Sequence, residues 1–362
     1  MTMRYGYWLP VFGGWLRNVQ DEGMDASWEY SSRLARRSEE LGYSLTLVAE
    51  LFLNDIKGID APSLDAWSTA AALAAVTDRL ELMVAVRPTF HQPAILAKQA
   101  ANIDRISHGR LSLNVVSSWW RDEARRYGVQ FDEHDDRYAR TEDWLTVLDG
   151  AWRTPRFSHV GPYYRTDETI LAPGPVWSPG RVRPTIYAGG ESVTAKSLIA
   201  RRCDAYVMHG DPPERIAPKI DDMRRRREQA SVAAEAATGA PLSPLSFGMA
   251  AYSIVRDTEA EAREELRRIT NVALGSPGYG NYQDFVRNSK LEQTLSLEDY
   301  SVSNRGLRAG LVGTPEQVAE RVRAFEDIGV DLLLLQCSPQ LEEMERFAEQ
   351  VMPLVPRELA LL

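Results

Sequence analysis

The sequence is short of the residues that build disulfide frameworks and metal centres. Its 362 residues include two cysteines, Cys203 and Cys337, and five histidines, and no Cys/His pair has the spacing of metal ligands. Both thiols suit a reducing cytoplasm, and Cys337, which follows a predicted strand, is interpreted as a buried, inert thiol. The sequence therefore predicts neither a disulfide-stabilised fold nor a metal site.

Long apolar runs and excess positive charge are also missing. No stretch approaches the roughly 18 consecutive apolar residues needed to cross a bilayer, and the N-terminus lacks a basic leader followed by an apolar run. The formal net charge is −9, so a basic face for nucleic acid is not expected, and the four arginines at 224–227 are interpreted as the solvated face of a helix. These features predict a cytoplasmic protein that binds neither membranes nor nucleic acid.

Eight apolar or β-branched segments alternate with helical patterns, which is the order of a (β/α)8 barrel. The predicted strands cover residues 4–9, 44–50, 80–86, 111–116, 185–188, 204–208, 246–255 and 330–336. A doubly wound open sheet with a second domain would need a linker that divides these strands, and none is present. The sequence thus predicts one α/β domain over residues 1–362, a (β/α)8 TIM barrel with insertions.

Two long segments interrupt this pattern. Residues 154–183 are rich in proline and glycine and are predicted to be irregular, and residues 270–312 are too long for a simple connection. The second segment is interpreted as a lid over the mouth of the barrel. Helices are expected to open at Ser63 and near Pro213, with an alanine-rich linker before Pro244.

The most informative stretch runs from Thr185 to Ser192. A strand ends in Gly189 and Gly190, and Ser192 stands at the N-cap of a helix that continues through Ala200. Glycines let the backbone approach a ligand closely, and the free N–H groups of a helix N-terminus favour a dianion. The turn also lies at the carboxyl end of a strand in a βαβ unit, where parallel α/β folds bind ligands. The stretch predicts a phosphate site, with a capped helix that binds nothing as the alternative.

Six sequence blocks, taken together, resemble the luciferase-like flavin-dependent monooxygenases, in the group that contains alkanesulfonate and dimethylsulfone monooxygenases. The blocks are LMVAVRP at 82–88, IDRISHGR at 103–110 leading into NVVS at 114–117, HDDRY at 134–138, AGGES at 188–192, GDPPE at 210–214 and GLRAGLVGTP at 306–315. The resemblance covers nearly the whole chain, and its order and spacing are more specific for the family than for a substrate.

The resemblance implies a luciferase-like barrel that uses reduced FMN (FMNH2) and O2, with the flavin delivered by a separate NAD(P)H-dependent reductase, and a homodimer or homotetramer. Residues matching the family's flavin-ring contacts are Glu50, Val86, Asn114 and Ser117. Those matching its phosphate end are Tyr138, Gly190, Glu191 and Ser192.

Catalytic roles are expected at three further positions. His209 ends the sixth strand, Arg308 lies in the expected lid, and Tyr252 is a candidate by position on the seventh strand. A structural histidine and a solvated loop arginine are the alternatives for the first two.

The chain departs from alkanesulfonate enzymes of the family at three positions, two of which carry cationic side chains in those enzymes. They have a cysteine where this chain has Ser63, and an arginine and a histidine where it has Ala250 and Tyr252. Losing two cations favours a small neutral substrate, either a sulfone or related organosulfur compound with C–S cleavage, or a halogenated or other apolar compound. Aromatic residues near the strand ends suit such a pocket, namely Trp8, Phe52, Phe90, Trp119 and Trp120.

Two other functions remain open at this point. Related barrels support deazaflavin-dependent hydride transfer, and a non-catalytic flavin-binding protein could descend from the same barrel. Cofactor titration would separate the first from an FMN enzyme, and failure to consume O2 despite tight FMN binding would indicate the second.

Overall fold

Eight parallel strands close into a barrel in the computed structural model, which describes residues 3–271, 282, 296–303 and 306–355. The sheet closes because β11 pairs with both β1 and β9, and β8 also pairs with β9. The barrel strands are β1 (Arg4–Trp8), β2 (Leu45–Val48), β3 (Glu81–Val86), β4 (Leu111–Val115), β7 (Thr185–Ala188), β8 (Ala205–Met208), β9 (Ser246–Val255) and β11 (Leu332–Gln336). This closure confirms the (β/α)8 barrel and excludes the open sheet.

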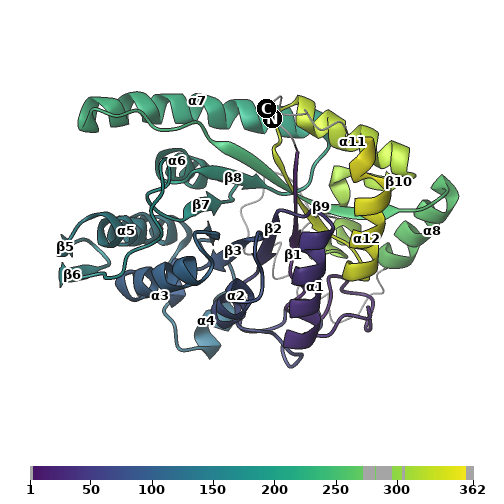
Figure 1. The fold of residues 1–362 in the computed structure, drawn as a ribbon, viewed down its shortest axis with the longest axis horizontal. Helices are drawn as coiled ribbons and strands as arrows, with labels where there is room; N and C mark the ends of the chain where they lie inside the picture. The colour runs from purple at the N-terminus through teal and green to yellow at the C-terminus, as the bar shows by residue number, and fades with distance from the viewer. Residues whose placement is uncertain (1–2, 272–281, 283–295, 304–305, 356–362) are drawn as a thin grey trace.

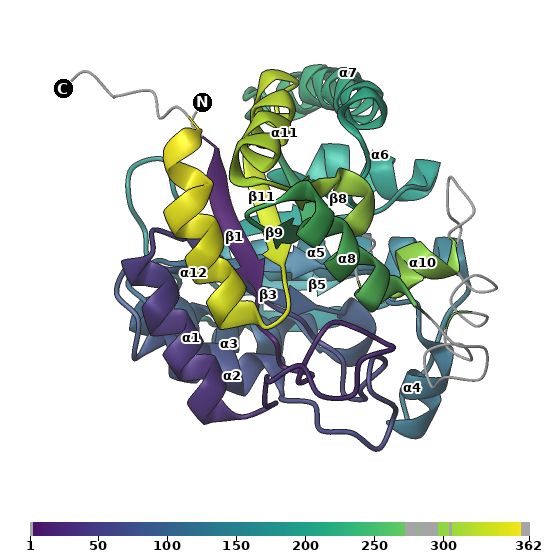
Figure 2. The same ribbon diagram turned by 90° about the vertical axis from the view of Figure 1, so that its right-hand side faces the viewer.

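Helices cover the outside of the barrel (Figure 1), and Figure 2 shows α12 and α1 beside β1. The helices are α1 (Trp28–Glu40), α2 (Ala66–Ala74), α3 (Pro93–Ile106), α4 (Arg121–Arg126), α5 (His134–Arg153), α6 (Val193–Arg202), α7 (Pro213–Thr238), α8 (Glu259–Thr270), α11 (Pro315–Asp327) and α12 (Gln340–Gln350). Side-chain caps stabilise the N-termini of several helices. Ser27 and Ser192 cap α1 and α6, and Thr314 forms a capping box at α11. Over the described ranges, no helix is long and apolar enough to cross a membrane.

The barrel strands are buried on both faces, as their apolar composition predicts. All five residues of β11 and five of the six in β3 are buried. Tyr7, Leu82, Leu113 and Leu334 belong to one continuous core that joins the strands to the surrounding helices. The strands therefore form a rigid frame, and the loops at their carboxyl ends are held in fixed positions around the barrel mouth.

Three local predictions were wrong. Residues 154–183 contain an antiparallel hairpin of β5 (Phe157–Val160) and β6 (Arg165–Thr169). Both strands are short and mostly polar, so they lack the apolar pattern by which strands are predicted from sequence. The alanine-rich segment is mostly helix, because α7 continues to Thr238 and ends at Gly239 with φ +78°. Helix α2 begins at Ala66 with Asp65 as its cap, while the Ser63 hydroxyl donates to Leu51 O at 2.8 Å.

Much of the expected lid lies outside the described residues. The described parts are α10 (Leu297–Tyr300), the 3-10 turn η2 (Gly306–Ala309) and β10 (Leu311–Gly313), which pairs with β9 outside the closed barrel. The stretch 296–303 is tied to the β1–α1 loop, because Arg17 N donates to Ser301 O at 3.0 Å and Ser303 N donates to Trp15 O at 3.1 Å. This stretch therefore forms part of the wall at the barrel mouth.

Candidate active site

A cavity of about 350 Å³ opens at the carboxyl ends of the barrel strands. Its lining includes Trp8 of β1, Leu47 of β2, Ala85 of β3, Asn114 of β4 and Val207 of β8, together with the loops that follow these strands. The volume is within the range of small-molecule sites, and barrel enzymes carry their active sites at this end. We therefore take this cavity as the candidate active site.

A larger hollow of about 1000 Å³ lies at the opposite end of the barrel, between α7 and α11. Phe247 and Asp331, which line it, stand at the amino ends of β9 and β11. Because the amino ends of barrel strands serve stability rather than catalysis, this hollow is not the better candidate despite its size.

Most of the site residues expected from the sequence line the cavity. They are Glu50, Asn114, Ser117, Tyr138, Gly190, Glu191, Ser192 and His209. His209 is exposed at the end of β8, as expected for a residue at the barrel mouth.

Val86 and Tyr252 are not among the lining residues. Val86 is fully buried, and the alternation of side chains along β3 instead brings Ala85 and Arg87 to the cavity. Tyr252 is 1% exposed, and burial raises its pKa well above the ordinary value, with the nearby carboxylate of Glu22 adding to the effect. The expected contacts of these two side chains with flavin or substrate are therefore not supported by their positions.

Arg308 also lies outside the lining, in η2. Its Nε is 3.2 Å from Asp211 Oδ1, so the ion pair links η2 to the connection between β8 and α7. The two segments pack closely, because a Cβ added at Gly210 would lie 3.1 Å from Gly306 Cα. In this arrangement Arg308 holds the segment against the barrel.

The turn between β7 and α6 has the features of an anion site. Ser192 Oγ accepts the N–H of Ala195 at 3.2 Å, and the other N–H groups of the first turn of α6 remain to face a ligand. Burial raises the pKa of Tyr138 despite its hydrogen bond with Ser192, so the phenol is a neutral donor beside the turn. Gly190 has no space for a side chain, since an added Cβ would lie 2.5 Å from Ala195 Cβ.

Unpaired polar atoms on the cavity wall also fit a bound flavin. Asn114 Oδ1, Trp8 Nε1 and Ser118 Oγ are buried and have no hydrogen-bond partner within the part of the chain that the structure describes. Buried polar atoms are nearly always paired, so such atoms are suited to a ligand with ring nitrogens and carbonyls. Ser118 also has φ +36°, an uncommon backbone conformation of the kind that clusters at functional sites.

Glu50 is fixed by a buried network at the end of β2. Its Oε2 accepts Arg87 N at 2.9 Å and lies 3.4 Å from Arg87 Nε, while Oε1 is 2.6 Å from His91 Nε2. Arg87 also pairs with Glu123, whose Oε1 accepts Phe52 N at 2.6 Å. The network holds the Glu50 carboxylate at the cavity wall. Its signal in the sequence was Arg87, a charged residue directly after the apolar strand β3.

The remaining wall is largely apolar. Trp8, Phe12, Trp15 and Ile56 line it, with Ala250 on β9. Of the other aromatic residues expected near the strand ends, Trp119 lines the cavity and stacks on Trp120 with ring centroids 5.6 Å apart, while Phe52 and Phe90 pack on the Arg87 guanidinium.

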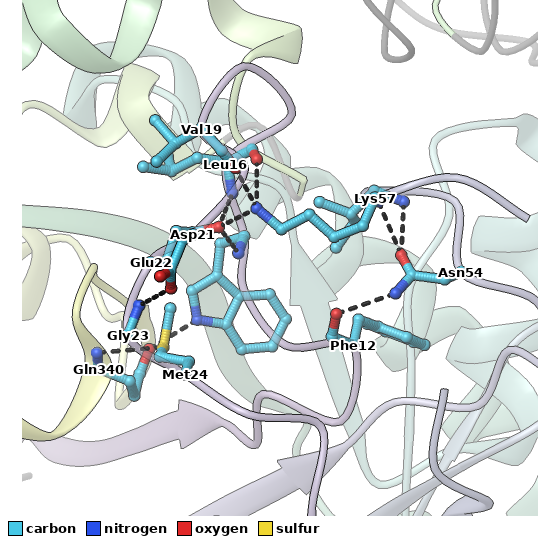
Figure 3. Close-up of polar contacts among 12 residues, drawn as sticks. Phe12, Leu16, Val19, Asp21, Glu22, Gly23, Met24, Asn54, Lys57 and Gln340 are labelled. Atoms are coloured by element: carbon cyan, nitrogen blue, oxygen red, sulfur yellow. Dashed lines mark hydrogen bonds and ion pairs between the residues drawn. The ribbon is translucent and has the colours of Figure 1, made fainter. Parts of the chain in front are cut away.

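The loop that carries Trp15 is held by a buried ion pair (Figure 3). Lys57 Nζ donates to Glu22 Oε1 at 2.6 Å and to Leu16 O at 2.8 Å. The same carboxylate oxygen accepts the backbone N–H groups of Trp15 and Leu16, each at 2.8 Å. Asn54 Nδ2 also donates a hydrogen bond to Phe12 O at 2.9 Å. Polar groups behind the wall thus position its aromatic face.

Sequence reasoning missed two further arginines that line the cavity, Arg17 and Arg137. Arg17 lies in a loop without periodicity, so no local pattern marks it, and it pairs with Asp55 Oδ2 at 2.9 Å. Arg137 lies within the HDDRY block, next to Tyr138, and that neighbour was the available signal.

Comparison with known proteins decides the family. The luciferase-like monooxygenase model matches residues 3–332. The chain belongs to the luciferase-like monooxygenase family. Over 99% of its length, this monooxygenase is 34% identical to the FMNH2-dependent dimethylsulfone monooxygenase of Pseudomonas putida and 33% identical to that of Pseudomonas fluorescens (strain Pf0-1), covering 96% and 95% of those proteins.

Its fold is shared with solved structures. The crystal structure of long-chain alkane monooxygenase (LadA) matches with a TM-score of 0.80, covering 98% of this chain and 91% of that one at 19% identity. At that identity the likeness shows the barrel fold alone. The family and the monooxygenase class predicted from the sequence are confirmed.

Proposed function

We propose that this monooxygenase is the oxygenase of a two-component system, which uses FMNH2 and O2 to oxygenate a small neutral compound, a dialkyl sulfone first. The observation that carries the proposal is its 33–34% identity, over 99% of the chain, to two proteins named FMNH2-dependent dimethylsulfone monooxygenases. A separate NAD(P)H-dependent reductase would supply FMNH2 in the cytoplasm, and we expect a homodimer or homotetramer.

The cavity offers groups for both ends of FMN. Ser192, Tyr138 and the first turn of α6 would hold the phosphate, while Glu50 and Asn114 would face the ring. Ser117, Gly190 and Glu191 complete the lining between these ends. When bound, reduced FMN supplies the electrons that activate O2.

The chain's own residues would orient the substrate and exclude water. The aromatic wall of Trp8, Phe12 and Trp15 keeps the reacting region dry, and this limits wasteful release of hydrogen peroxide. His209, at the mouth, is placed to give or take a proton. One oxygen atom enters the substrate and the other leaves as water. Oxygenation at the carbon next to a sulfonyl group then allows the C–S bond to break.

The charges around the wall favour a neutral substrate. Arg17 is paired with Asp55, and Arg87 is shared by Glu50 and Glu123, so neither offers a full positive charge to a sulfonate. The third lining arginine, Arg137, directly precedes Tyr138, which is proposed to hold the flavin phosphate. An anion buried there without a partner would cost several kcal/mol. Ala250, on the same wall, adds no polar group.

A product analysis tests the proposal. Protein, FMN, an NADH-dependent flavin reductase and O2 are incubated with a dialkyl sulfone, an alkanesulfonate of similar size or a halogenated aromatic, with a reductase-only control. We expect the sulfone to give the highest kcat/KM, with sulfinate and aldehyde as products. A sulfonate preferred by about tenfold or more, a margin of ~1.4 kcal/mol, would contradict the charge argument.

A deazaflavin-dependent hydride transfer is the second candidate, because the chain shares its barrel with a solved F420-dependent secondary alcohol dehydrogenase, at a TM-score of 0.73 and 17% identity. Titrating the protein with FMN and with a deazaflavin separates the two, and tighter binding of the deazaflavin would refute the FMN assignment.

A further inference from the structure

Arg17 lies on the side of the cavity opposite the turn between β7 and α6. It belongs to the loop that follows β1, and in the closed ring of eight strands β7 is four strands away from β1 in either direction. Arg17 lines the cavity there together with Phe12, Trp15, Asp55 and Tyr300. A flavin phosphate at the β7–α6 turn therefore leaves this side of the cavity for the substrate.

The Arg17 guanidinium is buried and paired. Arg17 is 4% exposed, its Nη1 donates to Asp55 O, and its Nη2 donates to Asp55 Oδ2 at 2.9 Å. The central carbon of the guanidinium lies 4.1 Å from the centroid of the Tyr300 ring. Burial by itself would lower the pKa of Arg17, but the Asp55 carboxylate outweighs this effect and raises it. The guanidinium is therefore charged, and it acts only as a hydrogen-bond donor.

One donor of this guanidinium is not used by the protein. Arg17 Nε is buried and has no hydrogen-bond partner among the residues that the structure describes. Buried donors nearly always have an acceptor, so an unpaired donor in a side chain that lines a cavity indicates a ligand that supplies one. Because Asp55 already balances the charge of Arg17, this acceptor need not be charged, and an anion would meet the Asp55 carboxylate as well.

We infer that the pair of Arg17 and Asp55 selects a neutral sulfonyl compound, with Arg17 Nε donating to a sulfonyl oxygen and the Asp55 carboxylate disfavouring an anion of the same size. The inference rests on the proposed function, since it takes an organosulfur substrate in this cavity. The competing explanation is structural. Arg17 would then only hold residues 296–303 against the β1–α1 loop, through the Tyr300 ring and the bond from Arg17 N to Ser301 O.

Dimethyl sulfone and methanesulfonate are the matched probes, because they have nearly the same size and both carry sulfonyl oxygens, but only methanesulfonate is charged. Arg17→Met should lower kcat/KM for dimethyl sulfone about 10- to 100-fold. The same variant should change the Kd of dimethyl sulfide, which has no sulfonyl oxygen, by less than about twofold in calorimetric titration with oxidised FMN present. Should Arg17→Met fail to fold, Arg17→Lys keeps the charge beside Asp55, lacks the Nε–H group and is measured in the same way.

Asp55→Asn tests the exclusion of anions. Asparagine retains an acceptor for Arg17 but removes the negative charge, so kcat/KM for methanesulfonate relative to dimethyl sulfone should rise by about tenfold or more. Asp104→Asn is the matched control. It makes the same change in another buried carboxylate, which lies 2.5 Å from Arg181 Nη2 and outside the cavity lining, and the wild-type substrate preference should persist.

The outcomes separate the inference from the proposed function. Equal losses of dimethyl sulfone and dimethyl sulfide binding in Arg17→Met would indicate the structural role and overturn the inference. An unchanged substrate preference in Asp55→Asn, or the same change in Asp104→Asn, would overturn it as well. Wild-type protein that converts neither dimethyl sulfone nor methanesulfonate would instead refute the proposed function, and the inference with it.

Discussion

Replacing Lys57 by methionine tests whether buried charge behind the aromatic wall holds the site together. The Glu22 side chain is 0% exposed, and its Oε2 has no hydrogen-bond partner in the described part of the chain. Without the ammonium group, Glu22 keeps two backbone N–H donors, from Trp15 and Leu16, but no cation within ion-pair distance among the described residues. Breaking a buried ion pair from one side costs about 3–5 kcal/mol, and we expect a loss of that size in the free energy of unfolding.

The double variant Glu22→Gln/Lys57→Met decides whether charge is the cause. Glutamine retains an acceptor for the N–H groups of Trp15 and Leu16, so the double variant should lose only about 1–2 kcal/mol and be more stable than Lys57→Met alone. Denaturant unfolding followed by tryptophan fluorescence measures both, with exposed Lys98→Met as the control, expected to stay within about 0.5 kcal/mol. A loss below about 1 kcal/mol for Lys57→Met, or a double variant as unstable as the sum of the singles, would refute the reasoning.

Further outcomes follow from individual contacts. Ser192→Ala and Tyr138→Phe should each weaken FMN binding about threefold to tenfold, the value of one hydrogen bond, and leave riboflavin binding unchanged, as measured by equilibrium titration with each flavin. Alanine at His209 should keep the melting temperature within a few degrees and raise the hydrogen peroxide released per product formed; a large loss of stability with normal coupling would show that His209 is structural. Arg308→Ala removes the ion pair between η2 and Asp211, so it should lower the melting temperature as well as raise the release of hydrogen peroxide; an unchanged melting temperature would show that this ion pair does not hold η2 against the barrel. Burial raises the pKa of Asp331, so its charged form opposes folding as the pH rises through that pKa; Asp331→Asn should melt higher than wild type at pH 7, and this gain should vanish below about pH 3.9, the pKa of the unfolded chain.

Local sequence patterns were sufficient for the barrel and for the turn that we propose binds an anion. A strand buried on both faces is apolar at nearly every position, so β3 and β11 are visible without any partner. The turn before α6 is equally local: two glycines and the Ser192 cap lie within four residues, and the structure forms the capping bond that they predict. Residues such as Ser192 and Tyr138 were therefore placed at the cavity from the sequence and the family blocks.

Only the tertiary structure decided which other side chains reach the cavity. Ala85 and Arg87 line the cavity and Val86 does not, because of the orientation of β3 in the closed barrel. A shift of the strand by one residue would exchange the two sets of side chains. Whether an arginine's charge is available depends on carboxylates far away in the chain: Asp55 neutralises Arg17, whereas no described carboxylate pairs with Arg137. Periodicity and caps act over a few residues, but a Coulomb interaction depends on distance in space, and folding alone sets that distance.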